Sequence, residues 1–201
     1  MYWFDGQNFD FRSPLRAHRN KRWASSFFFS IREISLLMTE SNLVQRADRE
    51  SVLIERVAVD DLFNLPVIEQ PPGNITYVSD QENILTIFSP ALRYGTQGII
   101  AHNTLAGAHF FELKPGMLIS ANYNDGNTVQ YRVKSVHHYQ ALSPESTTSR
   151  FRDLSDSDHH ISSTQLFFRM YNQPGSLVFQ TCIEKDGDPN WGRLFIITEQ
   201  V

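Results

Sequence analysis

Residues 117–133 read MLISANYNDGNTVQYRV, and this segment shows the fold class more clearly than any other. Apolar residues occupy alternate positions on both sides of Asn124-Asp125-Gly126-Asn127. A period of two is typical of a strand that buries one face. The Asp-Gly pair supplies the positive φ angles that tight turns between antiparallel strands require. The segment therefore predicts a β-hairpin.

Short apolar runs punctuated by Pro, Gly, Asn and Asp continue this pattern through residues 51–201. Such spacing predicts an all-β domain, either a sandwich or a barrel. Two of the runs, Leu177–Cys182 and Leu194–Thr198, are mainly apolar along their length, as expected of strands that are covered on both sides. Besides the hairpin, the predicted strands are Val52–Val59, Ile75–Ser79, Gly98–Asn103, Leu177–Cys182 and Leu194–Thr198.

Two other parts of the chain have a different character. Residues 1–50 are rich in Arg, Ser, Asn and aromatic side chains, and we interpret them as an N-terminal extension with a helix over residues 30–47. Residues 142–175 form a long and mostly polar connection. Connections of this length are usually lids over a functional site or disordered segments.

Composition limits the possible functions. A chain of 201 residues with 41% hydrophobic content is long enough for one well-buried core. Its net charge of -4 gives no basic surface, so nucleic acid is not expected as a partner. The apolar run Phe27–Ile31 is interrupted by Arg32, whereas a membrane span needs roughly 20 apolar residues. We expect no membrane span, and no leader or anchor is visible.

Metal and cofactor sites are also not expected. The acidic residues Asp153, Asp156 and Asp158 do not have the spacing of an EF-hand calcium loop. His159-His160 has no third ligand at a recognisable spacing. The sequence therefore predicts no metal and no cofactor.

Cys182 is the single cysteine, so the chain forms no internal disulfide. It ends the predicted strand Leu177–Cys182, and a polar segment suited to a surface loop follows. A cysteine nucleophile needs a nearby base or cation and access for its substrate, and the end of a strand provides both. Taken alone, however, a lone cysteine in an apolar strand is more often an inert core residue.

Two more residues favour a reactive thiol. Arg193 opens the next apolar strand, eleven residues after Cys182, and a short return brings it beside the thiol. A guanidinium there can stabilise a thiolate, a substrate carbonyl or a developing oxyanion. His102 stands at the polar end of another apolar strand, and imidazole can act as acid and base near neutral pH.

The papain-like and caspase-like signatures do not fit, because His precedes Cys here and the local motifs differ.

A series of short segments resembles one protein family. Ile100-Ala101-His102-Asn103 is followed by Phe110–Gly116, then Tyr131-Arg132-Val133, then Val178–Cys182, then Arg193-Leu194-Phe195. In this order and spacing, residues 52–201 resemble the sortases of bacterial cell surfaces. Ala101 and Val178-Phe179 depart from the residues usual in that family, so the chain resembles a divergent member.

The resemblance implies an eight-stranded β-barrel with short helices that acts as a cysteine transpeptidase. It implies that Cys182 attacks a sorting-motif peptide, often Leu-Pro-x-Thr-Gly, to form a thioester, and that His102 protonates the leaving amine. Arg193 would hold the substrate or the oxyanion, an amine acceptor would resolve the thioester, and the location would be extracytoplasmic or at the cell surface. The substrate-binding residues suggested with them are Thr181, Asn103 and Trp191.

Two alternatives remain open beside the transpeptidase. A thiol peptidase would release the same acyl-enzyme to water, and the product formed in the presence of an amine separates these two activities. A catalytically inactive binding module would keep the barrel without the chemistry, and an unreactive Cys182 would favour it.

Overall fold

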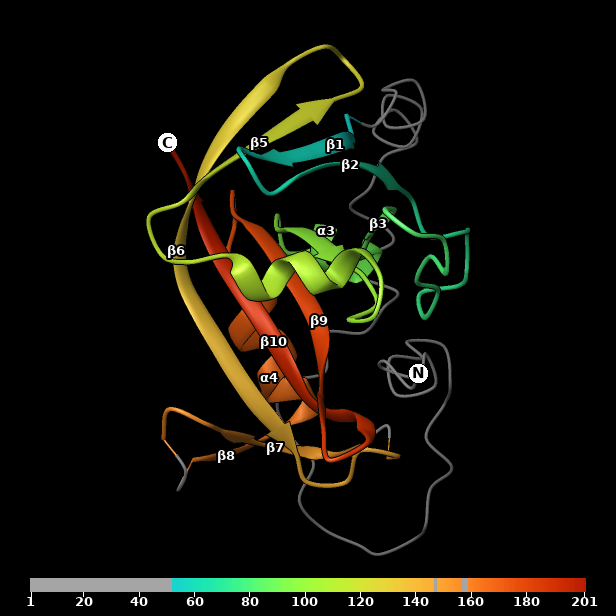
Figure 1. The fold of residues 1–201 in the computed structure, drawn as a ribbon, viewed down its shortest axis with the longest axis vertical. Coiled ribbons are helices and arrows are strands. Elements are labelled where there is room, and N and C mark those ends of the chain that lie inside the picture. The colour runs from blue at the N-terminus through green and yellow to red at the C-terminus, as the bar shows by residue number, and fades with distance from the viewer. Residues whose placement is uncertain (1–51, 147, 157–158) are drawn as a thin grey trace, which may run out of the picture. The chain divides into compact units, whose positions relative to one another are not determined.

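The structure is a computed structural model and describes residues 52–146, 148–156 and 159–201. In this part of the chain, eight strands close into a barrel in the order β10-β9-β4-β3-β2-β1-β5-β6, with β6 pairing back onto β10 (Figure 1). The predicted barrel is therefore confirmed. Its strands are β1 (Ile54–Val59), β2 (Phe63–Ile68), β3 (Leu85–Ile87), β4 (Gln97–Ile100), β5 (Leu118–Tyr123), β6 (Thr128–Ala141), β9 (Leu177–Lys185) and β10 (Asp188–Gln200).

The predicted hairpin forms β5 and β6. Ile119 pairs with Tyr131 and Ala121 with Val129, and all four side chains are directed into the core. Gly126 adopts a φ of 84° at the turn, where a residue without Cβ avoids strain. Strand β6 continues to Ala141, well past its predicted end, because β10 pairs with it along most of its length.

Apolar side chains form two layers. The interior cluster draws buried residues from each of the eight barrel strands, and the 3-10 helix η2 (Ala106–Glu112) adds Ala106 and Phe110 to it. The outer cluster lies on the other face of β4, β9 and β10, where the helix α4 (Ser163–Tyr171) covers the sheet. Accordingly, η2 and α4 lie on opposite sides of β9 and β10 (Figure 1).

The described residues of the connection 142–175 include regular strands and a helix, so the interpretation of this connection as a disordered segment does not hold for them. It contains the strands β7 (Arg150–Asp153) and β8 (His160–Ser162), which extend the sheet from β6, and then α4. Helix α4 begins with a capping box, in which Ser162 and Gln165 each bond the other's backbone N–H. Its apolar face packs into the outer cluster, which offsets the entropy of ordering the segment.

Other boundaries also differ from the predictions. Residues 75–79 form no strand, because the carbonyl oxygens of Ile75 and Tyr77 accept hydrogen bonds from the Gln70 side chain rather than from a neighbouring strand. A short helix, α3 (Ser89–Leu92), precedes β4.

The N-terminal extension and its predicted helix lie outside the described residues. None of the described helices has the length and apolar character needed to cross a membrane.

Candidate active site

Cys182 lies within β9, three residues before the strand ends at Lys185. The expected placement at a strand end is therefore wrong, because β10 pairs with β9 past this position. The side chain belongs to the outer cluster and is 0% exposed, which also contradicts the expected access for substrate. Its Sγ lies 4.0 Å from Oδ1 of Asn190, a buried residue that the sequence did not single out.

Arg193 stands directly opposite Cys182 in the antiparallel register of β10 and β9. Residues directly opposite each other project from the same face of a sheet, so the guanidinium and the thiol share the outer face. Arg193 is 6% exposed rather than a surface residue at the start of a strand. Its Nη1 donates to the carbonyl oxygens of Asn190 at 3.0 Å and Gly192 at 2.8 Å.

Gly192 allows the close strand approach that places Arg193. A Cβ on Gly192 would lie 2.5 Å from the carbonyl oxygen of Tyr139 on β6, a distance that real side chains essentially never show. The preceding part of β10 also contains a register shift between Asp188 and Gly192. This irregularity turns the backbone so that its carbonyl oxygens meet the guanidinium.

His102 follows β4, which runs parallel to β9. Ile100 pairs with Gln180 in this register, and the Ala101 amide still donates to the Gln180 carbonyl at 3.4 Å. His102 lies two residues past Ile100, and Cys182 lies two residues past Gln180. Ile100 belongs to the outer cluster and Ala101 to the interior cluster, and the half-buried His102 comes after the end of the strand, just before a turn.

A turn into η2 fixes the backbone of His102. Its carbonyl oxygen accepts hydrogen bonds from the amides of Leu105 at 3.0 Å and Gly107 at 2.9 Å. A Cβ on Gly107 would lie 2.7 Å from that oxygen and 2.5 Å from Oγ1 of Thr181, so the turn closes only over glycine. Gly107 is a positioning residue that the spacing of the motifs did not reveal.

Burial lowers the pKa of His102 below its usual 6.5, although a hydrogen bond with the Val78 backbone and the charge of Asp80 act in the opposite direction. Desolvation disfavours the charged imidazolium, and here it is the dominant cause. The ring is accordingly neutral at pH 7, the state in which imidazole accepts a proton.

The three suggested substrate-binding residues lie in different elements, namely β9, the turn after β4 and β10. Thr181 is 0% exposed, and its hydroxyl donates to the Ala101 carbonyl at 2.9 Å, on the opposite face from Cys182. Asn103 lies in the turn after His102, and Trp191 lies in β10 with Nζ of Lys185 4.8 Å from its ring centroid. Because Thr181 contributes its side chain to the barrel interior, the structure gives it a role in packing.

Gln180 is a further residue that the sequence reasoning passed over. It is the one amide side chain within the apolar segment 177–182, and this polarity was the signal that could have identified it. The side chain is fully buried, and its Oε1 accepts from the hydroxyl of Tyr171 on α4. It shares the outer face with Cys182 because the two are separated by one residue of the strand.

The described residues define the class of fold: a closed β-barrel in which Cys182 and Arg193 share the outer face of the adjacent strands β9 and β10. No family model and no curated protein matches the chain. Among solved structures, it is similar to the SrtA sortase of Actinomyces oris, with 13% identity over 76% of this chain and 81% of that one and a TM-score of 0.48. It is also similar to sortase A of Corynebacterium diphtheriae, with 12% identity over 81% and 69% of the two chains and a TM-score of 0.46.

A third similar structure is Clostridium perfringens sortase C with the C-terminal cell wall sorting motif. It is 13% identical over 74% of this chain and 71% of that chain, with a TM-score of 0.43. Likenesses at these identities do not assign an activity to the chain.

Proposed function

We propose that this chain is a sortase-like cysteine transpeptidase in which Cys182 is the nucleophile, His102 the acid and base, and Arg193 the group that holds the substrate carbonyl or oxyanion. The register of β4, β9 and β10 carries the proposal. It pairs Arg193 with Cys182, and we infer that His102, two residues past the end of β4, reaches the same side of the sheet. These three residue types on one face match the needs of thiol acyl transfer.

The reaction begins when the Cys182 proton passes to His102 and the thiolate attacks the peptide carbonyl. Arg193 donates hydrogen bonds to the oxyanion that forms. The carbon–nitrogen bond then breaks, the leaving amine takes the proton from His102, and a thioester remains on Cys182. An amine acceptor gives a proton back to His102 as it attacks the thioester, and a new peptide bond and the free thiol result.

The full burial of Cys182 sets a condition for this reaction. A peptide reaches Sγ only in a conformation in which the thiol becomes accessible, so binding and opening are coupled steps. The same burial favours a second candidate, a binding module that keeps the barrel but performs no chemistry, because an inert core thiol is also fully buried.

Intact-protein mass spectrometry tests the proposal. The protein is incubated with a library of Leu-Pro-x-Thr-Gly peptides and related motifs, with and without a glycine oligomer as amine acceptor. A thioester adduct that the acceptor converts to a peptide conjugate supports the transpeptidase, whereas an adduct resolved only by water identifies a thiol peptidase.

Three variants complete the experiment. Cys182→Ala should abolish the adduct, and His102→Ala should abolish turnover because no group remains to protonate the leaving amine. His138→Ala, at an exposed position of β6, is the matched control and should retain activity. Absence of any adduct, with peptide binding retained by Cys182→Ala, would reject catalysis in favour of the binding module.

A further inference from the structure

Residues 69–84, which are all described, join the parallel strands β2 and β3 without a strand or helix of their own. Loops of this length inside a compact domain are usually functional. The segment lies next to β3 (Figure 1), and the side chain of Val78 packs against the outer cluster, to which Cys182 also belongs. The loop therefore reaches the side of the sheet that carries the proposed nucleophile.

Gln70 is the buried centre of this loop. Its Nε2 donates to the carbonyl oxygens of Ile75 at 2.7 Å and Tyr77 at 2.9 Å, and its Oε1 accepts the amide of Ser89 at the start of α3 at 3.0 Å. Both N–H groups and the oxygen of the side-chain amide are thus engaged. One side chain therefore fixes Tyr77, and with it the following residue Val78.

Thr86 sets the direction of the peptide group between Val78 and Ser79. Leu85 and Ile87 belong to the interior cluster, so Thr86 between them faces outward, and its Oγ1 accepts the Ser79 amide at 3.0 Å. The C=O and N–H groups of a planar trans peptide point in opposite directions. The carbonyl oxygen of Val78 is therefore directed away from Thr86.

The ring of His102 forms a hydrogen bond with the Val78 backbone. This bond raises the pKa of the ring, so the ring N–H is the donor and the Val78 carbonyl oxygen is the acceptor. The register agrees, because Ile100, two residues before His102, pairs with Thr86. A neutral imidazole has one N–H, and donating it to Val78 leaves the other ring nitrogen as a proton acceptor.

We propose that the Val78 carbonyl oxygen orients the His102 ring and fixes its tautomer, and that Thr86 and Gln70 are positioning residues that hold this carbonyl in place. A thiol nucleophile and its base commonly depend on a third group that orients the base. The consequence for catalysis rests on the proposed function: the ring nitrogen left free is the one that takes the Cys182 proton and returns it to the leaving amine.

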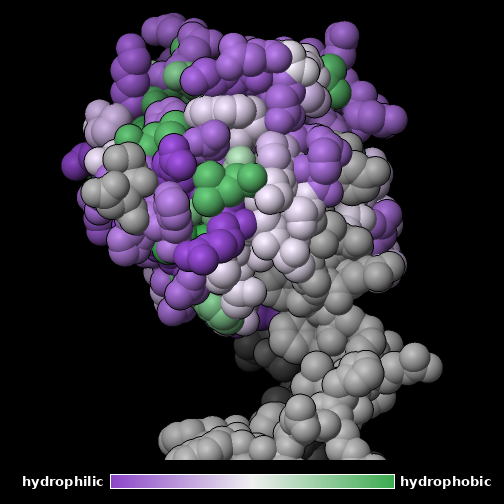
Figure 2. All heavy atoms as spheres, turned by 90° about the horizontal axis from the view of Figure 1, so that it is seen from below, coloured by the Kyte–Doolittle hydropathy of each residue, from purple (hydrophilic) through white to green (hydrophobic). Residues whose placement is uncertain are grey.

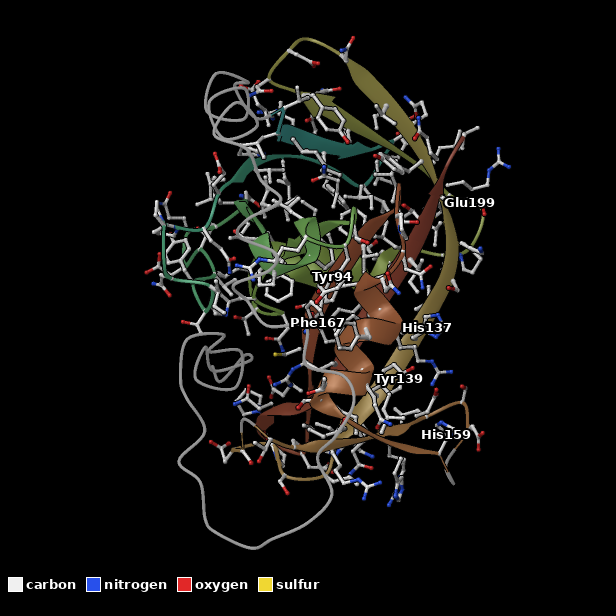
Figure 3. The ribbon with its side chains drawn as sticks, turned by 180° about the vertical axis from the view of Figure 1, so that it is seen from behind. Tyr94, His137, Tyr139, His159, Phe167 and Glu199 are labelled. Atoms are coloured by element: carbon white, nitrogen blue, oxygen red, sulfur yellow. The ribbon has the colours of Figure 1, made fainter. Side chains whose placement is uncertain are left out.

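Nitrogen-15 nuclear magnetic resonance of the full chain at pH 8, where the His102 ring is neutral, measures the tautomer. The signal is assigned by its loss in His102→Asn. His159 is the internal reference. Its side chain is exposed, and Figure 3 shows it at the end of the molecule that carries β7 and β8, where the surface in Figure 2 is mainly hydrophilic. We expect a single tautomer for His102 and an average of both for His159. An averaged His102 ring overturns the proposal without any variant.

Thr86→Val removes the acceptor of the Ser79 amide but keeps the shape of the side chain. It should give a mixture of His102 tautomers, and the pKa of the ring should fall further, since the bond to Val78 raises it. Thr86→Ser keeps the hydroxyl and should retain both properties. The nearby Asp80 charge also raises the pKa, so the tautomer is the property that isolates the hydrogen bond.

Thr198→Val is the matched control, because it removes another buried hydroxyl, one that bonds Leu177. It should leave the His102 tautomer unchanged, and a mixture in this variant as well would assign the effect to general destabilisation and overturn the role of Thr86. A variant that does not fold leaves the decision to the tautomer in the original protein.

Gln70→Met tests the second support of the loop. Methionine has a similar length but no N–H donors, so the carbonyl oxygens of Ile75 and Tyr77 lose their partner. The His102 tautomers should again become mixed. If Gln70→Met and Thr86→Val both fold and both keep the single tautomer, neither side chain positions Val78 and that part of the proposal is overturned.

Kinetics on a peptide that Cys182 cleaves test the consequence for catalysis. Thr86→Val should lower kcat at least about tenfold and change KM less than about twofold, because a misplaced base slows the chemistry rather than binding. Thr86→Ser should restore kcat. An unchanged kcat beside mixed tautomers overturns the catalytic half while the proposed function stands. If no peptide forms a thioester but the single tautomer depends on Thr86, the proposed function fails while the orientation of His102 by Val78 remains.

Discussion

Cys182 and Arg193 face each other across the antiparallel pair β9 and β10, and both side chains are buried on the same side of the sheet. The guanidinium of Arg193 is not exposed to solvent. Its Nη1 donates hydrogen bonds to the carbonyl oxygens of Asn190 and Gly192, which hold it in place. Burying a cation is costly unless its donors are satisfied, and Nη1 of Arg193 donates to two carbonyl oxygens. This relationship makes the pair the centre of the proposed site.

Arg193→Lys should lower kcat/KM for a cleaved peptide by roughly 100-fold, the usual cost of losing a positioned donor to an oxyanion. A lysine ammonium is a point charge and does not reproduce the planar fork of donors. Steady-state kinetics measure the effect, and Arg132→Lys on the exposed side of β6 is the control. Full activity of Arg193→Ala on a peptide that Cys182 cleaves would remove Arg193 from the mechanism.

Gly107→Ala should destabilise the protein by about 1–3 kcal/mol, because the added methyl group overpacks a closed turn. It would lie 2.5 Å from Oγ1 of Thr181 and 2.7 Å from the His102 carbonyl oxygen, so His102 must shift. Urea unfolding measures the change in stability. The control Ala108→Ser, at an exposed position of η2, should stay within about 0.5 kcal/mol. An unchanged stability of Gly107→Ala would show that this turn does not constrain His102.

Thr181→Val should cost about 1–3 kcal/mol of stability, since it leaves the buried Ala101 carbonyl without the hydroxyl that bonds it. KM for a cleaved peptide should remain unchanged, because the side chain lies in the barrel interior rather than on the face of Cys182. Thr198→Val removes another buried hydroxyl that bonds Leu177, and provides a control of similar cost. A raised KM with unaltered stability would restore Thr181 as a substrate-binding residue.

Stability should fall as the pH decreases through and below 6.5, the usual pKa of histidine. Burial lowers the pKa of both His102 and His137, so the unfolded chain takes up protons at a pH where the folded protein does not. This contribution to stability is therefore present above pH 6.5 and is lost as the pH falls toward the lowered pKa values.

Urea unfolding between pH 8 and pH 5 measures this dependence. His102→Asn and His137→Asn should each flatten it, whereas His138→Asn should not, because His138 is exposed. A slope that is the same in all three variants would show that neither half-buried histidine is responsible.

Local patterns were sufficient to predict the strands that alternate or are mainly apolar. The hairpin at Asn124-Asp125-Gly126-Asn127 was correct because its turn residues and its period of two agree. The strands β9 and β10 were identified as buried on both sides, and α4 is the cover that buries their outer face. The strand predicted at residues 75–79 was wrong, since a side chain of Gln70 rather than a strand satisfies its backbone.

The sequence by itself determined that Cys182 and Thr181 project to opposite faces of one strand, because side chains alternate along any extended chain. Only the tertiary structure decided that Thr181 faces the interior, since closure of the barrel makes one face the inside. Parallel pairing of β4 with β9 likewise brings Ile100 beside Gln180 across about eighty residues of chain. Such a contact depends on strand order, and no local pattern of residues encodes the order in which distant strands pair.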